Sequence, residues 1–388
     1  MDRHALVLAG GGARAAYQVG CLRAIARRVP DWRPRILTGV SAGAINAAHL
    51  ASYQGSWDVS VEALADLWLS LDTEKVFRTD ARTILTNMIA TALPLVTGGR
   101  VGKRRVRGMV DTQPLRAFLE SALQLDPGRN LRGVRQNIED GLLESLAIIT
   151  TNYETGRSTA WVESKAPKDV GHGQLRVERG RIGLAHVMAS AALPLFFPAV
   201  ALGSAWHGDG GIRLTAPLSP ALHLGATRIL AVSPRMRPPD PASLPALPEL
   251  PIYPSPGQIG GILMNAVFLD SLDFDALQMS RINQLLGLLP EHEAKTTGMR
   301  PVEVLVLRPS RDLGALARMN EFRLPRAFRF FEKGLTHSHT RSSDVLSMVI
   351  FEPEFLRELI ELGERDTAAR GDEIESFLRG EACSVPVW

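Results

Sequence analysis

The sequence lacks the features that mark several protein classes. Its 388 residues include two cysteines, Cys21 and Cys383. Two are too few for a disulfide-rich scaffold, and free thiols fit a reducing compartment. No run of about 20 apolar residues occurs, so we expect no membrane-spanning helix. The net charge is only +3 and no long run of like charge occurs, which argues against nucleic-acid binding.

The N-terminal segment also lacks a signal sequence. Residues 1–12, MDRHALVLAGGG, have no long apolar region before the glycines, so we expect a cytoplasmic protein. What the sequence has is ordinary globular composition, 45% hydrophobic and 22% charged. This composition supports a large core, built as one large α/β domain or as two smaller ones.

Short apolar runs alternate with helical patterns at the start of the chain. Residues 5–9, ALVLA, stop at Gly10 and predict a buried parallel strand. A helix is expected over 13–29, then a strand over 35–38 and a helix over 42–52. This order is typical of a parallel sheet covered by helices.

The later chain contains a proline-rich connector. Nine prolines lie between residues 234 and 258, which indicates an extended segment. Beyond it, residues 302–310 are expected to add a strand to the same sheet. The further elements expected are mainly helical chain over 58–135, a strand pair at 145–153 and 157–163, a helix over 182–192, a strand at 228–233, and helical chain over 259–289 and again after residue 310.

Three short segments carry candidate chemistry, and the first is a glycine loop. Gly10, Gly11 and Gly12 lie between the first strand and the first helix. There, backbone amides and the positive end of the helix dipole can hold a phosphate or an oxyanion. A tight turn without a ligand is the alternative. Gly10, Gly12 and Ala15, with Asp31 downstream, also match a dinucleotide-binding fingerprint, which leaves a dinucleotide-binding oxidoreductase open.

The second segment is a G-x-S-x-G motif. Ser41 lies between Gly39 and Gly43, after an expected strand and before an expected helix. On such a sharp turn the serine is presented as a nucleophile, and the glycines avoid clashes. A plain turn with an ordinary serine is the alternative. Only one strand precedes Ser41, whereas an α/β-hydrolase places several before its nucleophile, so that fold is disfavoured.

The third segment offers a base for the serine. Histidine is the usual base, but the histidines after Ser41 lie in no convincing motif. They include His49, His172, His186, His207 and His223. Asp209, by contrast, is followed by Gly210 and Gly211, and a carboxylate in a tight loop can accept a proton from a neighbouring hydroxyl. A functionless Asp-Gly turn is the alternative.

These three segments, in this order, resemble the patatin-like phospholipase family, whose marks are G-G-G-x-R/K, G-x-S-x-G and D-G-G/A. Smaller similarities to bacterial members lie at 109–119, 189–200 and 304–310. The resemblance covers residues 5–235 well. It implies a three-layer α/β/α fold with a mainly parallel central sheet and a mostly helical C-terminal extension.

The resemblance also implies a role for each site residue. Ser41 is the nucleophile and Asp209 the base of a Ser-Asp dyad that uses no histidine. The backbone amides of Gly10, Gly11 and Gly12 form the oxyanion hole. Arg14 steadies this loop or adds positive charge, and Ala15 stands where members often have glycine. The glycines that shape the elbow and the aspartate loop are Gly39, Gly43, Gly210 and Gly211.

The implied function is hydrolysis of carboxylic esters in phospholipids or other lipids. It is of phospholipase A or lysophospholipase type, proceeds through an acyl-enzyme, and needs no metal or cofactor. A catalytically inactive relative that binds a membrane or a protein is the alternative. The implied organisation is a catalytic domain over 5–235 and a Pro-rich connector with a C-terminal extension over 236–388, packed on the same fold.

One further segment predicts a peripheral membrane contact. Residues 84–97 are apolar, and residues 100–108 contain five basic side chains. Such a pair can rest on an anionic membrane. A core helix followed by a solvated basic loop is the alternative.

Overall fold

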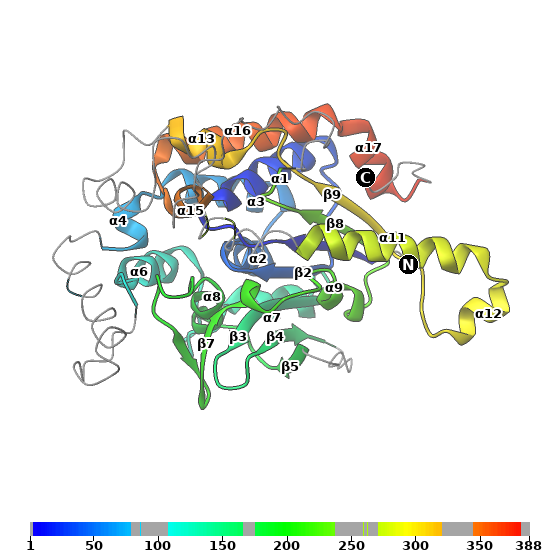
Figure 1. Ribbon diagram of the computed structural model, residues 1–388, viewed down its shortest axis with the longest axis horizontal. Helices are drawn as coiled ribbons and strands as arrows, with labels where there is room; N and C mark the ends of the chain where they lie inside the picture. Colours follow the sequence, from blue (N-terminus) through cyan, green and yellow to red (C-terminus); the bar gives the residue numbers. More distant parts are fainter. Residues whose placement is uncertain are drawn as a thin grey trace, which may run out of the picture.

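The computed structural model describes residues 3–78, 86, 108–165, 175–236, 259, 262, 271–319 and 344–381 (Figure 1). Within these ranges nine strands form one sheet, in the order β5-β4-β3-β2-β1-β8-β9, with β7 paired to β3 and β6 to β7. The strands are β1 His4–Leu8, β2 Ile36–Val40, β3 Ser145–Asn152, β4 Arg157–Ser164, β5 Leu175–Arg179, β6 Val200–Leu202, β7 Ala205–Asp209, β8 Arg228–Val232 and β9 Glu303–Leu307.

The described helices lie mostly between and after these strands. In the first two thirds of the chain they are η1 Gly12–Ala15, α1 Ala16–Arg28, α2 Ala42–Ser52, α3 Trp57–Leu69, α4 Thr73–Val76, α6 Gln113–Ala122, α7 Arg132–Glu139, α8 Leu184–Ser190, η2 Gly210–Ile212 and α9 Ser219–His223. In the last third they are α11 Ser271–Leu288, α12 Glu291–Thr296, α13 Leu313–Met319, α15 Asp344–Val349, α16 Pro353–Ala369 and α17 Gly371–Arg379.

The centre of the sheet is parallel. β1 runs parallel to β2 on one side and to β8 on the other, β2 is parallel to β3, and β8 is parallel to β9. The chain therefore leaves β1 and β2 at the same edge of the sheet. As a result, the glycine loop and the G-x-S-x-G motif, which follow these two strands, begin side by side.

Alternating side chains of β1 face two separate cores. Leu6 and Leu8 pack with α1, α2, α3 and α16, whereas Ala5 and Val7 pack with α9 and α11. Strands buried on both faces read as continuous apolar runs, which explains the pattern of ALVLA. The expectation of a mainly parallel sheet between helical layers, with a helical C-terminal part, is confirmed.

Most expected elements are present, with shifted boundaries. The expected pair at 145–153 and 157–163 is the antiparallel pair β3–β4, and the strand expected at 302–310 is β9, which joins the sheet beside β8. The helix expected from residue 13 begins as the 3-10 turn η1, and α1 starts at Ala16. Residues 237–258 of the proline-rich connector lie outside the described residues, and the division near residue 235 stays a prediction.

Helix α16 packs along α1, although more than 300 residues separate them in the sequence (Figure 1). Two glycines allow the close crossing. A Cβ atom on Gly20 would lie 1.9 Å from the carbonyl oxygen of Ile360, and one on Gly363 would lie 2.3 Å from the carbonyl oxygen of Tyr17. Because the obstacle in each case is backbone, α16 is held close against α1, the helix that follows the glycine loop.

This crossing predicts the effect of Gly20→Ala. The added methyl group cannot fit without moving α16, so we expect a loss of about 1–3 kcal/mol in the free energy of unfolding, measured in urea. Gly287→Ala is the matched control, because a Cβ on Gly287 in α11 meets nothing within 4 Å. That variant should gain up to about 1 kcal/mol from helix propensity. Equal effects of the two substitutions would contradict the packing argument.

Candidate active site

Ser41 lies at the sharp turn between β2 and α2, in a backbone conformation that L-residues rarely adopt. Its φ and ψ angles are 56° and −132°, which costs about 1–3 kcal/mol. The flanking glycines are required by close packing: a Cβ on Gly43 would lie 2.2 Å from the carbonyl oxygen of Leu8, and one on Gly39 would lie 2.5 Å from that of Gly43. The motif thus has the geometry of a nucleophile elbow.

The glycine loop lies directly against this elbow. A Cβ on Gly10 would lie 2.9 Å from Cβ of Ser41. Gly12 has a φ of +57°, and its own Cβ would lie 2.1 Å from the carbonyl oxygen of Met348. Within the described ranges, the amides of Gly10, Gly11 and Gly12 donate no hydrogen bond. No acceptor in the described part of the chain therefore engages these amides, and oxyanion holes are built from such donors.

A buried polar chain fixes the loop and the elbow relative to each other. The side-chain amide of Gln18 donates to the carbonyl oxygen of Ala9 at 2.7 Å, and that of Asn46 donates to the amide oxygen of Gln18 at 2.9 Å. Asn46 in turn accepts a 2.6 Å bond from the indole of Trp68. These three residues were not predicted from the sequence. The sequence shows only that Gln18 and Asn46 are polar residues on otherwise apolar faces of α1 and α2.

Arg14 is buried rather than presented to the site. Its side chain is 3% exposed, and Nε donates to Oγ of Ser347 on α15 at 2.7 Å. This contact joins the glycine loop to the C-terminal part of the chain, and the role expected for Arg14 stays a prediction. Ala15 ends the turn η1 and is fully buried.

Asp209 is the last residue of β7 and is fixed through its backbone. Its amide donates to the carbonyl oxygen of Ala192 at 3.0 Å, and its carbonyl oxygen accepts from Oγ1 of Thr151 at 2.7 Å. The amide of Gly211 donates to Oδ1 at 2.9 Å. A Cβ on Gly210 would lie 2.3 Å from the carbonyl oxygen of Ile149, so the loop closes tightly on β3.

The carboxyl group of Asp209 is fully buried. Desolvation raises its pKa to about 7, against the lowering effect of the Ser41 hydroxyl and the Gly211 amide. Oδ2 has no hydrogen-bond partner in the described part of the chain. A carboxylate whose pKa lies near neutrality is well matched to accepting a proton from a hydroxyl.

Ser190, at the end of α8, connects the two halves of the site and was not predicted. Its hydroxyl accepts a 3.0 Å bond from the amide of Ser41 and donates a 2.6 Å bond to the carbonyl oxygen of Ile149. Ile149 immediately precedes the β3 residues that pair with β7 at Asp209. Ser190 lies in the segment 189–200, which was noted in the sequence for its family resemblance but given no role.

Among the described residues, no histidine forms a hydrogen bond with Ser41. His49 and His186 are largely buried, and burial lowers the pKa of each to about 4. Nδ1 of His207 lies 2.9 Å from Oγ1 of Thr150, and Nδ1 of His223 contacts the carbonyl oxygen of Ser219. His172 lies outside the described residues.

The dinucleotide alternative is not supported by the topology. Gly10 follows the carboxyl end of β1, whereas Asp31 precedes the amino end of the parallel strand β2. The two residues therefore lie at opposite edges of the sheet. An acidic side chain that binds a ribose would have to lie at the same edge as the glycine loop.

A small apolar cavity adjoins the serine. Ser41 is 6% exposed, and the cavity, about 50 Å³ in volume, is lined beside it by Ile45, Leu193, Phe197 and Phe351 among others. Such a lining can accept a hydrocarbon chain but offers few polar contacts. The cavity in its present form has room for only a few water molecules.

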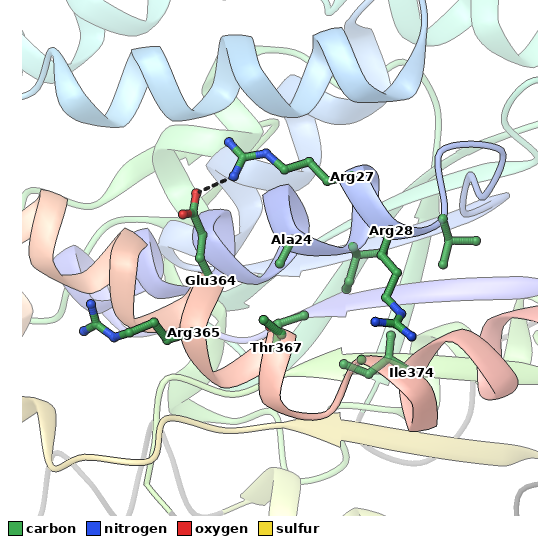
Figure 2. Close-up of a pocket in the computed structure, with 11 residues that line it drawn as sticks. Ala24, Arg27, Arg28, Glu364, Arg365, Thr367 and Ile374 are labelled. Atoms are coloured by element: carbon green, nitrogen blue, oxygen red, sulfur yellow. Dashed lines mark ion pairs between the residues drawn. The ribbon is translucent and has the colours of Figure 1, made fainter.

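A wider hollow, about 510 Å³, lies away from the site between α1 and α16 (Figure 2). Its charged groups are already paired. Arg27 lies 3.6 Å from Glu364, and Arg28 lies 2.9 Å from Glu375. None of the residues expected in the active site lines this hollow, so it has no direct part in the chemistry at Ser41.

The segment expected to contact a membrane, 84–108, lies outside the described residues except for residues 86 and 108. Across the described ranges, no helix has both the length and the apolar character needed to cross a bilayer.

Comparison with known proteins places the chain in a family. Residues 6–222 match the family described as patatin-like phospholipase, which is more than half of the chain. The chain belongs to the patatin-like phospholipase family, as its motifs predicted. No curated protein matches it.

Solved structures give distant matches. One is VipD from Legionella pneumophila, at 13% identity and a TM-score of 0.38, where the match covers 98% of this chain and 67% of that one. Another is human GIVD cytosolic phospholipase A2 in complex with methyl gamma-linolenyl fluorophosphonate, at 14% identity and a TM-score of 0.43, covering 98% of this chain. This chain spans only 59% of the human protein's length.

The position of Ser190 predicts a loss of stability in Ser190→Ala. This substitution leaves the buried amide of Ser41 without its acceptor, so we expect a loss of about 1–3 kcal/mol in the free energy of unfolding in urea. Ser60→Ala is the matched control, because the buried Ser60 hydroxyl has no hydrogen-bond partner in the described part of the chain. A Ser190→Ala loss no larger than that of Ser60→Ala would refute the bridging role.

Proposed function

We propose that this protein is a serine lipid acyl hydrolase of phospholipase A or lysophospholipase type, with Ser41 as nucleophile and Asp209 as base. One observation carries the proposal. A serine held at a positive φ of 56° interacts with a fully buried carboxyl group whose pKa is raised to about 7, beside a loop of free backbone amides. Family membership supports a lipid ester as substrate.

The reaction begins with attack of Oγ of Ser41 on the ester carbonyl carbon. The Asp209 carboxylate accepts the hydroxyl proton as the new C–O bond forms. Negative charge develops on the carbonyl oxygen, where the amides of Gly10, Gly11 and Gly12 stabilise it. Collapse of this intermediate expels the alcohol, which takes the proton back from Asp209 and leaves an acyl group on Ser41.

A water molecule then releases the acyl group by the same steps in reverse. Asp209 accepts a proton from the water as it attacks the acyl-enzyme, and returns that proton to Oγ of Ser41. The carboxyl group must therefore be ionised at the start of each half-reaction. Its raised pKa makes it a stronger base than an ordinary aspartate, while the ionised form is still available near neutral pH.

The substrate is inferred from the cavity and the family together. The side chains of Ile45, Phe197 and Phe351 form an apolar surface next to Ser41, which suits the acyl part of a lipid rather than a charged head group. The contact of residues 84–108 with an anionic membrane is part of this proposal and is tested by vesicle binding after the basic residues of 100–108 are replaced.

The dyad is tested with Ser41→Ala and Asp209→Asn. Hydrolysis of p-nitrophenyl butyrate and of phosphatidylcholine by each variant should fall by on the order of 10²-fold or more relative to wild type, because each substitution removes a group from the reacting set. Ser60→Ala serves as the control and should retain wild-type rates. Circular dichroism checks that every variant is folded.

Two results would overturn the proposal. Full activity in a folded Ser41→Ala protein would exclude Ser41 as the nucleophile. A folded wild-type protein that hydrolyses neither substrate and is not labelled by a fluorophosphonate would identify the chain as an inactive family member.

A further inference from the structure

The loop between α8 and β6 exposes a leucine in a strained conformation. Residues 193–198 read LPLFFP, and Leu195 has a φ of +66°. A positive φ is sterically unfavourable for leucine, because its Cβ atom approaches the backbone too closely. The side chain of Leu195 is also 83% exposed, so burial within the chain does not compensate for the strain.

Hydrogen bonds hold the loop in this shape. The amide of Phe197 donates to the carbonyl oxygen of Leu193 at 2.8 Å. The amide of Met109 lies 3.2 Å from the carbonyl oxygen of Leu195 and 3.0 Å from that of Phe196. These hydrogen bonds fix the backbone of the loop, and the fixed backbone holds Leu195 in its exposed position.

The inner side of the same loop belongs to the cavity at Ser41. Leu193 and Phe197 line that cavity, and the rings of Phe196 and Phe197 lie 5.8 and 5.9 Å from the ring of Phe77. One side of the loop thus lines the cavity. Leu195, which lies two residues from both Leu193 and Phe197, is exposed to solvent instead.

The cavity must also enlarge to accept a lipid. Its volume of about 50 Å³ holds only a few water molecules, which is far less than a fatty acyl chain needs. The loop of residues 193–198 would have to adjust to such a chain, because two of its side chains, Leu193 and Phe197, form part of the cavity wall.

We propose that residues 193–198 are an interfacial docking loop, in which Leu195 inserts into the hydrocarbon region of a lipid surface next to the Ser41 cavity. The segment has no charged residue, so it fits hydrocarbon rather than charged head groups or an acidic partner. Backbone strain such as the positive φ of Leu195 clusters at functional sites. The inference deepens the proposed function and rests on it for the identity of the substrate.

The test measures binding to vesicles without requiring activity. Ser41→Ala protein, alone or combined with Leu195→Asn, is sedimented with neutral phosphatidylcholine vesicles. Asparagine tolerates a positive φ, so this substitution removes the apolar side chain without opposing the loop conformation. Leu288→Asn, in the same Ser41→Ala background, is the matched control, because Leu288 is 81% exposed on α11.

We expect Leu195→Asn to weaken binding to neutral vesicles roughly tenfold or more, since burial of one leucine side chain is worth at least that factor. Leu288→Asn should bind as the Ser41→Ala protein does. In the active protein, Leu195→Asn should lower the ratio of vesicle hydrolysis to p-nitrophenyl butyrate hydrolysis. Equal binding of the two asparagine variants, or no binding of the Ser41→Ala protein to neutral vesicles, overturns the docking loop.

These outcomes separate the loop from the dyad. If the wild-type protein hydrolyses neither ester but Leu195→Asn still loses vesicle binding, the proposed chemistry fails and the docking loop stands. If hydrolysis depends on Ser41 but vesicle binding is indifferent to Leu195, the dyad stands and the docking loop fails.

Discussion

The structure depends on the close approach of two backbone segments, the loop after β1 and the elbow after β2. A Cβ on Gly43 would lie 2.2 Å from the carbonyl oxygen of Leu8, and a Cβ on Gly10 would lie 2.9 Å from the Cβ atom of Ser41. No larger residue fits at either position without a shift. The parallel pairing of β1 and β2 brings the segments together, and their contact holds the serine beside free backbone amides.

A second set of contacts holds Asp209, the proposed base, and no histidine side chain takes part in them. Asp209 is held by the antiparallel pairing of β7 with β3, and Ser190 joins β3 to the amide of Ser41. The carboxyl group of Asp209 is fully buried, and the Ser41 hydroxyl is among the groups that lower its pKa. Burial raises its pKa because the charged form loses its hydration. The carboxylate is therefore a stronger base than one exposed to water. Strain at Ser41 and desolvation at Asp209 are both tolerated because two well-packed cores surround the sheet.

Much of this arrangement could be predicted from the sequence, because it rests on local patterns. ALVLA and the alanine-rich residues 42–52 carry the periodicities of a buried strand and a packed helix, and the glycines mark the sharp turns. Strand β5 was missed because three of the five residues of Leu175–Arg179 are charged and its apolar residues, Leu175 and Val177, are only partly buried. Ser190 and Gln18 were missed because their roles arise from contacts with residues that are distant in sequence, such as Ser41 and Val232, which no local pattern encodes.

The most direct test of the account is the pH dependence of covalent labelling of Ser41 by a fluorophosphonate. The rate should rise with increasing pH as one group with a pKa of about 7 loses its proton, because only the carboxylate form of Asp209 can accept the serine proton. In Asp209→Asn this rise should be absent and labelling should be slow at every pH. A rate independent of pH in the wild type, or the same rise in Asp209→Asn, would contradict the assignment of Asp209 as the base.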